Sequence, residues 1–195
     1  MSIAVNDAVV NDDAQLIKDT LAGQTAAFGQ LVCKYQDRLY NAIVHITGSP
    51  EDARDVVQDA FVQAFIKLDA FRGSSAFYTW LYRIAFNVSV SRFRRQRPTV
   101  SIEQTREVSG EEPVDENSPS DRMVQTERAM QVQNALALLS EEHRKILVLR
   151  EMEGFDYERI SEILDVAVGT VRSRLFRARM QMRELLANVV QEDMK

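Results

Sequence analysis

Apolar residues recur at three- and four-residue spacing along most of the chain, and strand-like alternation is nearly absent. This spacing places apolar side chains on one face of an α-helix. In residues 51–68 the stripe consists of Ala53, Val56, Val57, Ala60, Phe61, Ala64, Phe65 and Leu68. In residues 77–88 it consists of Phe77, Trp80, Leu81, Ile84 and Val88, which leaves Tyr78, Arg83 and Asn87 on other faces. The pattern predicts an all-α fold.

The helical pattern stops between residues 98 and 126, where prolines, serines, glycines and acids gather. Seven acidic and two basic residues give this segment a net charge of −5. Such a segment has little apolar surface to offset the entropy of ordering it. We therefore expect a flexible acidic linker over residues 99–127. It follows an N-terminal tail with the start of a first helix (1–25) and a helical domain (26–98), and it precedes a second helical domain (128–190).

The net charge of the whole chain is also −5, so the two helical domains together are near neutral. Residues 70–102 and 166–183 each hold several arginines and no acid. Two such clusters are typical of proteins that contact phosphate groups of nucleic acid. Taken singly, each cluster also fits a solvated helix face.

Several kinds of chemistry have no support in the sequence. Cys33 is the only cysteine, and His45 and His143 are isolated, so neither a disulfide nor a closed zinc site is expected. There is no glycine-rich phosphate loop and no nucleophile with a neighbouring base. We expect no enzyme activity and no cofactor. Without a signal peptide at residues 1–11 or an apolar run long enough for a membrane span, we expect a soluble, cytoplasmic protein with no membrane insertion.

The sequence of the C-terminal domain predicts a helix-turn-helix. Ser140, followed by Glu141 and Glu142, is a good N-cap for one helix, and Asp156 can cap the next one. A short turn over residues 165–169 leads to a third, arginine-rich helix from Thr170 onward. Two helices joined by a tight turn, with the second one basic, are typical of DNA-binding domains.

The face of this last helix opposite its apolar stripe predicts the DNA contacts. Arg172 and Ser173 lie near its N-terminal end, where side chains reach base edges in the major groove. Arg177 lies one turn on, and the flanking Arg174 and Arg179 suit phosphates. Phe176 fits this face or the core equally well. For Arg183 we favour simple solubility.

Two runs of the C-terminal domain resemble region four of the extracytoplasmic-function (ECF) sigma factors: FDYERISEIL (155–164) and VGTVRSRLFRAR (168–179). The resemblance implies that this helix reads the minus-thirty-five promoter element, through Tyr157, Glu158, Thr170, Arg172, Ser173, Arg174, Phe176, Arg177 and Arg179. Asp165 stands where the family often has glycine, and Asp tolerates a left-handed turn conformation. Ala167 stands where the family often has Ser or Pro, so a helix cap is expected to be lost.

The run FRGSSAFYTWLYRIAFN (71–87) is similar to sigma region 2.3, which captures a base flipped from the minus-ten element. The resemblance implies minus-ten contacts from Phe71, Arg72, Ser74, Ser75, Phe77, Tyr78, Thr79, Arg83, Asn87, Arg94 and Arg95. For Phe77 and Trp80 we favour core packing instead. Ser74 stands where close families often have an acid, so the flipped base is not assigned.

Residues 51–68 resemble sigma region 2.2. The resemblance implies that Asp55, Gln58, Asp59 and Phe61 contact the β′ clamp helices of core RNA polymerase. The implied partners are core polymerase (β′ clamp helices and β flap), promoter DNA and an anti-sigma factor, and the free protein is expected to be a monomer. The alternative is a stand-alone helix-turn-helix regulator that binds repeated half-sites as a dimer. That alternative leaves residues 51–97 unexplained.

Overall fold

The computed structural model describes residues 4–96 and 119–192, and the side chains of residues 12–92 and 129–187. Every regular element within these ranges is a helix, which confirms the all-α prediction. The chain divides into two compact units, residues 1–44 with 51–101 and residues 45–50 with 102–195. Among the described helices, none is both long enough and apolar enough to cross a membrane.

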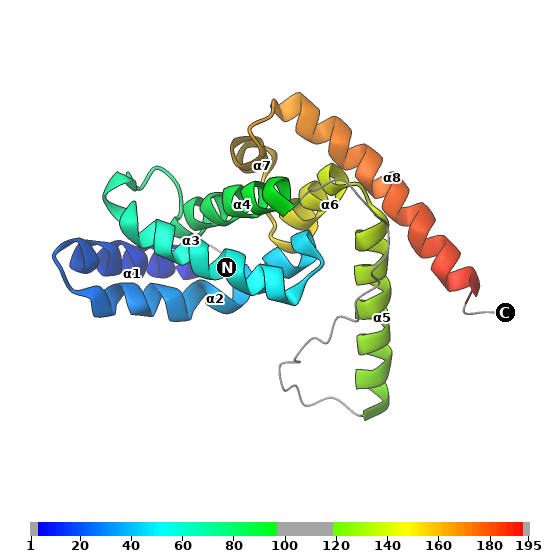
Figure 1. Cartoon of the computed structure of the whole chain (residues 1–195), viewed down its shortest axis with the longest axis horizontal. Helices are drawn as coiled ribbons and strands as arrows, with labels where there is room; N and C mark the ends of the chain where they lie inside the picture. The colour runs from blue at the N-terminus through cyan, green and yellow to red at the C-terminus, as the bar shows by residue number, and fades with distance from the viewer. Residues whose placement is uncertain (1–3, 97–118, 193–195) are drawn as a thin grey trace. The chain divides into compact units, whose positions relative to one another are not determined.

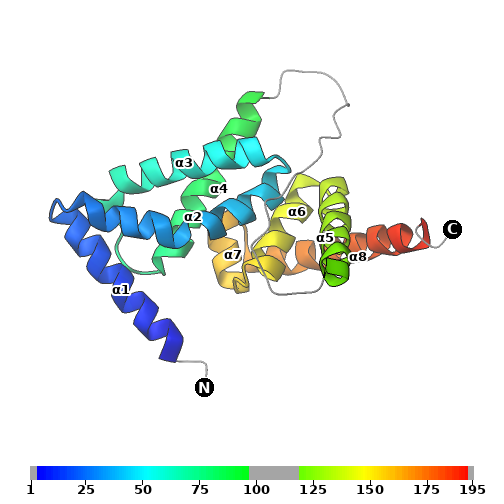
Figure 2. The ribbon, with the colours of Figure 1, turned by 90° about the horizontal axis from the view of Figure 1, so that it is seen from below.

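The N-terminal unit begins with two antiparallel helices, α1 (Ala4–Leu21) and α2 (Thr25–Thr47), joined by a turn at Gly23 (Figure 1). Gly23 has a φ of +96°, a conformation in which only glycine is unstrained. Helix α3 (Pro50–Ile66) follows α2, and Figure 2 shows these two helices running alongside each other. A 3₁₀ turn, η1 (Leu68–Ala70), and the loop 71–76 then lead to α4 (Phe77–Gln96).

The predicted apolar stripe of α3 is buried, with one exception. Phe65 is 44% exposed and packs edge-on against Phe28 of α2, with 5.0 Å between ring centroids. On α4, Tyr78 departs from the prediction in the opposite direction. The helical pattern predicts Tyr78 away from the core, but it is only 5% exposed because its ring stacks on Tyr35 of α2. Helical periodicity could not anticipate this neighbour.

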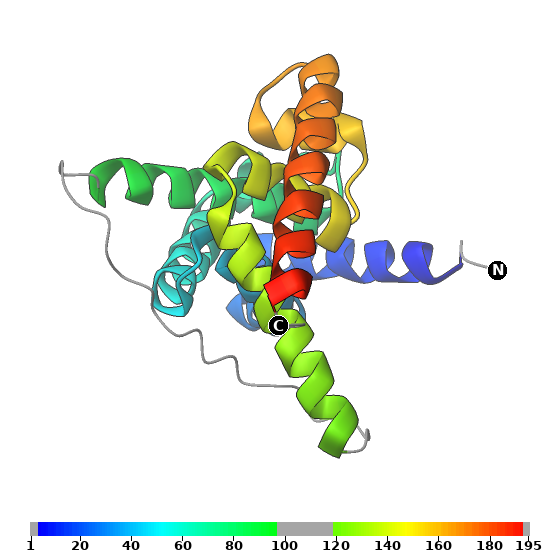
Figure 3. The same cartoon turned by 90° about the vertical axis from the view of Figure 1, so that its right-hand side faces the viewer.

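The C-terminal unit consists of α5 (Pro119–Leu138), α6 (Glu141–Leu147), the π-helical turn η2 (Val148–Met152), α7 (Tyr157–Leu164) and α8 (Val168–Glu192). Helix α8 packs on α5, α6 and α7, and in Figure 3 it crosses in front of α5. The buried side chains between these helices include Leu136, Ile146, Leu149, Ile160, Ile163, Val171, Leu175 and Ala178. Residues 119–127 of the predicted linker belong to α5 and are helical. The rest of the predicted linker, residues 99–118, lies outside the described residues.

Two helix starts in this unit are capped as the sequence predicts. The Ser140 hydroxyl accepts a hydrogen bond from the backbone N–H of His143, 3.4 Å away. The Asp156 carboxylate accepts one from the N–H of Arg159 at 2.7 Å. These side chains satisfy N–H groups that have no partner within the helix. Each cap fixes where its helix begins.

The turn between α7 and α8 also follows the local sequence. Asp165 ends α7 in the left-handed conformation, with φ 53° and ψ 50°. The hydroxyl of Ser161 donates to the carbonyl oxygen of Val166 at 2.5 Å and holds the turn against α7. Helix α8 begins at Val168, two residues earlier than the expected Thr170. Ala167, just before it, has no side-chain acceptor to cap it, as its departure from the family pattern predicts.

Candidate nucleic-acid and polymerase interfaces

The outer face of α8 is solvent-exposed at four predicted positions, Arg172, Ser173, Phe176 and Arg177. Its opposite face is buried against α5, α6 and α7, which is why the outer face is available for a ligand. Phe176 is 68% exposed, so it belongs to the surface rather than to the core. The Ser173 hydroxyl donates back to the carbonyl oxygen of Thr170 at 3.1 Å. Together these side chains form a helix face of the kind that enters a major groove.

The guanidinium group of Arg172 lies over an aromatic ring. Its central carbon is 5.8 Å from the ring centroid of Tyr157, the first residue of α7. The guanidinium carbon of Arg150 lies 5.2 Å from the same ring, and Arg150 also donates to the carbonyl oxygen of Phe155 at 2.8 Å. Such contacts stabilise by ~0.5–1 kcal/mol each at exposed sites. Tyr157 therefore restricts the orientation of the Arg172 side chain.

Two other cations of α8 are paired with acids of the same unit. Arg174 lies 3.4 Å from the Glu142 carboxylate. Arg179 makes two bonds to one carboxylate oxygen of Glu151, of 2.6 and 2.9 Å. These bonds raise the pKa of Arg179 above its ordinary value.

Within the part of the chain that the structure describes, neither Arg172 nor Arg177 has a carboxylate at ion-pair distance. The cations predicted to contact phosphates are thus paired internally, whereas those predicted near the base edges are not. Glu158 is exposed on α7, and Thr170 is half-buried at the start of α8. Arg150 and Glu151 could not be predicted from the sequence, because the π-helical turn η2 that carries them has no sequence signature of its own.

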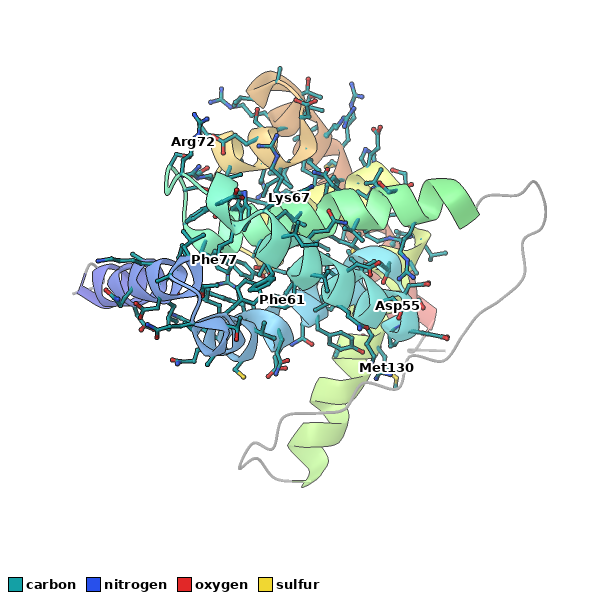
Figure 4. The ribbon with its side chains drawn as sticks, turned by 60° about the vertical axis from the view of Figure 1, so that its left-hand side comes forward. Asp55, Phe61, Lys67, Arg72, Phe77 and Met130 are labelled. Carbon is teal, nitrogen blue, oxygen red and sulfur yellow. The ribbon has the colours of Figure 1, made fainter. Side chains whose placement is uncertain are left out.

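The loop 71–76 of the N-terminal unit is exposed at Arg72 and Ser74 and half-buried at Phe71 and Ser75. It bends at Gly73, whose φ of +68° favours glycine. In Figure 4 Arg72 lies at the outer side of this loop. The loop thus presents a cation and small polar side chains to solvent.

Phe77, the residue that follows the loop, is 2% exposed and lies inside the N-terminal unit (Figure 4). Its ring centroid is 5.9 Å from Phe71 and 5.8 Å from Trp80. The core role that the sequence favours for Phe77 is confirmed. Trp80 is half-buried, so part of its side chain remains accessible to solvent.

Along α4, Arg83 and Asn87 are exposed four residues apart and therefore on one face. Thr79 is half-buried at the start of the same face. The side chains of Arg94 and Arg95 lie outside the described residues. The exposed loop leads directly into α4, on which Arg83 and Asn87 are exposed, whereas Phe77 and Tyr78 are buried.

The predicted polymerase surface on α3 combines acidic side chains with an apolar groove. Asp55, Gln58 and Asp59 are exposed, and Asp55 forms a 3.1 Å ion pair with Arg92 of α4. Phe61 is buried, but it lines an open groove of about 490 Å³ between α2 and α3. The groove is lined by Phe28, Val32, Gln36, Arg54, Val57, Gln58, Phe61, Val62 and Phe65.

Exposed apolar residues beside this groove extend the predicted polymerase surface. Val62, Phe65 and Ile66 are all large apolar side chains left in contact with solvent. Adjacent exposed apolar residues often mark an interaction surface. Phe65 belongs to the apolar stripe in the sequence, so periodicity alone does not separate it from the core residues.

Comparisons with known proteins match both units. The family Sigma-70 region 2 matches residues 31–99, and the family Sigma-70, region 4 matches residues 129–182. The chain is 40% identical over 186 residues to the RNA polymerase sigma-H factor of Pseudomonas aeruginosa, which covers 92% of this chain and 96% of that protein. It is also 40% identical over 185 residues to the ECF RNA polymerase sigma-E factor of Escherichia coli (strain K12), covering 92% and 94%.

Solved structures agree with these matches. CnrH, in complex with the cytosolic domain of CnrY, superposes with a TM-score of 0.66 at 27% identity, covering 91% of this chain and 98% of that one. The sigma factor RpoE of Bartonella quintana, in complex with the anti-sigma factor NepR, also gives a TM-score of 0.66, at 28% identity, covering 82% and 96%. These relatives define a two-region protein of the sigma-70 type.

The chain belongs to the extracytoplasmic-function (ECF) group of the sigma-70 family. It is an RNA polymerase sigma factor, and it directs promoter recognition, promoter melting and transcription initiation. The stand-alone regulator is set aside, because the matches span both units and thereby account for residues 51–97.

Proposed function

We propose that this sigma factor divides promoter recognition between its two units. The outer face of α8 reads the minus-thirty-five element as a double helix, and the loop 71–76 with α4 holds the unpaired strand of the minus-ten element. The observation that carries the proposal is the contrast between the two surfaces. One is a regular helix face with Arg172 held over Tyr157, and the other is a bent loop above a packed aromatic layer.

Base reading by α8 is proposed for Arg172, Ser173 and Arg177. An arginine that meets both acceptors of a guanine edge forms the strongest common base contact in the major groove. Arg172 is suited to this because Tyr157 orients it and no described carboxylate competes for it. Arg174 and Arg179 contact the flanking phosphates after exchanging their glutamate partners.

Strand opening is proposed for the loop and the outer face of α4. A flipped base costs a few kcal/mol of unstacking, which the pocket has to offset. Phe71, Ser74 and Ser75 form the accessible wall of that pocket, and Arg72, Arg83 and Asn87 hold the strand beside it. Phe77 and Tyr78 support the pocket from the core rather than touch the base.

Binding to core polymerase is proposed for the α3 surface and for the C-terminal unit, which contact the β′ clamp helices and the β flap respectively. On α3, acids beside an apolar groove suit a basic, amphipathic helical partner, because the acids steer association and the groove supplies apolar contact. Phe65 and Val62 add to the predicted set of Asp55, Gln58, Asp59 and Phe61.

Regulation by an anti-sigma factor is proposed from the solved relatives, since RpoE was solved with one. We further propose that the free protein is a cytoplasmic monomer that acts by binding rather than by catalysis. Gel filtration of the purified protein tests the monomer, and a monomer that shifts to a one-to-one complex with its inhibitor is expected.

Run-off transcription with bacterial core polymerase, with and without the protein, tests the proposed division of roles. We expect protein-dependent starts at promoters that share two sequence blocks. The double variant Asp55→Ala with Asp59→Ala should bind core polymerase more weakly while its helix content stays unchanged. Normal affinity for core polymerase in that variant would remove both residues from the interface.

A further inference from the structure

Arg38 of α2 stacks on an aromatic residue of α4. Its guanidinium carbon lies 4.1 Å from the ring centroid of Tyr78. Arg38 is exposed, while Tyr78 beneath it is buried. Arg38 could not be assigned a role from the sequence, because it lies 40 positions before Tyr78 and outside both arginine clusters.

The Tyr78 ring beneath Arg38 is held in place by Tyr35 of α2, which is in turn bound to α1. Tyr78 stacks on Tyr35 with 5.4 Å between ring centroids and 29° between ring planes. The hydroxyl of Tyr35 donates to the buried Asp13 carboxylate at 2.5 Å, and Lys34 donates to the same carboxylate at 2.6 Å. Burial, together with the bond to Asp13, raises the pKa of Tyr35, so the phenol stays protonated as a donor. The support for Arg38 is therefore fixed by contacts from three helices.

This stack is continuous with the aromatic layer under the loop 71–76. Tyr35 lies 5.8 Å from Phe77, and Phe77 lies 5.9 Å from Phe71 of the loop. Arg38 and the loop are thus attached to one aromatic cluster. Sites for unpaired nucleic acid combine aromatic rings with nearby cations that follow the backbone.

We propose that Arg38 is a further DNA-binding residue, which contacts a phosphate of the unpaired minus-ten strand next to the base held by loop 71–76. This inference rests on the proposed role of that loop. The planar guanidinium carries five N–H donors, so one face can stack on Tyr78 while its edge meets a phosphate. A solvated arginine that only stabilises the fold is the competing interpretation.

The test is the affinity of the holoenzyme for two labelled DNA probes, measured over a range of salt concentrations. One probe is a promoter fork with an unpaired minus-ten strand, and the other is a duplex that carries only the minus-thirty-five element. Arg38→Ala should weaken binding to the fork about three- to tenfold, the effect of one charged hydrogen bond partly replaced by water. The slope of log affinity against log salt should fall by ~0.7, as for one lost contact to a single strand.

Three further variants make the result specific. Arg38→Lys keeps the charge but loses the planar stack, so it should retain most of the salt slope and only part of the affinity. Lys18→Ala removes an exposed cation of α1 outside the aromatic cluster and should leave both probes unaffected. Arg72→Ala reports on the loop itself and should weaken the fork alone.

The outcomes separate the inference from the proposed function. Fork affinity and salt slope of Arg38→Ala equal to wild type, with Arg72→Ala impaired, would overturn the role of Arg38 only. No effect of either variant would overturn the single-strand site as a whole. Equal weakening on both probes would also count against the inference, because it would show a general charge effect. A melting temperature close to wild type in Arg38→Ala excludes loss of fold as the cause.

Discussion

The α8 face and the loop 71–76, for which we propose different DNA targets, also have different structures. The α8 face is a regular helix whose cations point outward, two of them tied to glutamates of the same unit. The loop is bent, and its cation stands above a layer of packed rings. A paired double helix offers base edges in a groove of fixed width, whereas an opened strand offers ring faces and a mobile backbone. A rigid helix therefore suits the first target, and a bent loop over packed aromatic rings suits the second.

The proposed DNA-binding residues and the residues that support them are arranged differently in the two units. On α8 the proposed DNA-binding residues and the buried residues lie on opposite faces of one helix, so a substitution on the outer face leaves the core intact. Around the loop they are adjacent in sequence, since exposed Ala76 precedes buried Phe77. In the N-terminal unit, a loss of DNA binding therefore has to be interpreted together with a measurement of stability. For α8 such a measurement matters less.

The largest effect is expected from Phe77→Ala, which should destabilise the N-terminal unit by ~3–5 kcal/mol because it leaves a cavity in the core. Arg72→Ala should change stability by less than ~0.5 kcal/mol and still weaken binding to an unpaired minus-ten strand. Trp80 is the only tryptophan, so its fluorescence during denaturant unfolding reports on this unit. A Phe77→Ala protein of normal stability that fails to bind the strand would place Phe77 in the pocket instead.

The next effect concerns base reading. Arg172→Ala should lose ~1–3 kcal/mol of discrimination between the preferred and a substituted minus-thirty-five base, if it meets a guanine edge. Arg183→Ala, an exposed cation of the same helix, is the matched control and should not alter discrimination. Competition binding of the holoenzyme to the two duplexes measures both variants. An equal loss on all sequences would identify Arg172 as a phosphate contact.

The turn that sets the direction of α8 gives the third effect. Asp165→Val should destabilise the C-terminal unit by ~1–2 kcal/mol, because a β-branched residue is strained at a φ of 53°. Asp165→Gly, the control, removes that strain and should be at least as stable as wild type. Unfolding followed by circular dichroism measures the two variants. Equal stability of the Val and Gly variants would show that the turn relaxes at no cost.

Local features of the fold were predictable from the sequence, and long-range ones were not. The caps at Ser140 and Asp156 and the left-handed Asp165 depend on residues next to them in the chain, so composition and spacing indicate them. The burial of Tyr78 depends on Tyr35, which lies on another helix. The partner of Arg179 is set by a π-helical turn that has no sequence pattern. Of the candidate site, the exposed face of α8 followed from periodicity, whereas its internal ion pairs did not.

The smallest effect tests whether the internal ion pairs of α8 restrain DNA binding. Glu151→Gln removes the partner of Arg179, and because both groups are about half exposed, stability should change by ~0–1 kcal/mol. If Arg179 exchanges this partner for a phosphate, affinity for the minus-thirty-five duplex should rise by up to about fivefold, since the exchange no longer breaks a pair. Glu162→Gln, which breaks an exposed pair within α7, controls for the loss of one negative charge. The gain from Glu151→Gln should vanish when Arg179 is also changed to alanine, and a gain that persists in that double variant would mean that Glu151 acts on DNA directly rather than through Arg179.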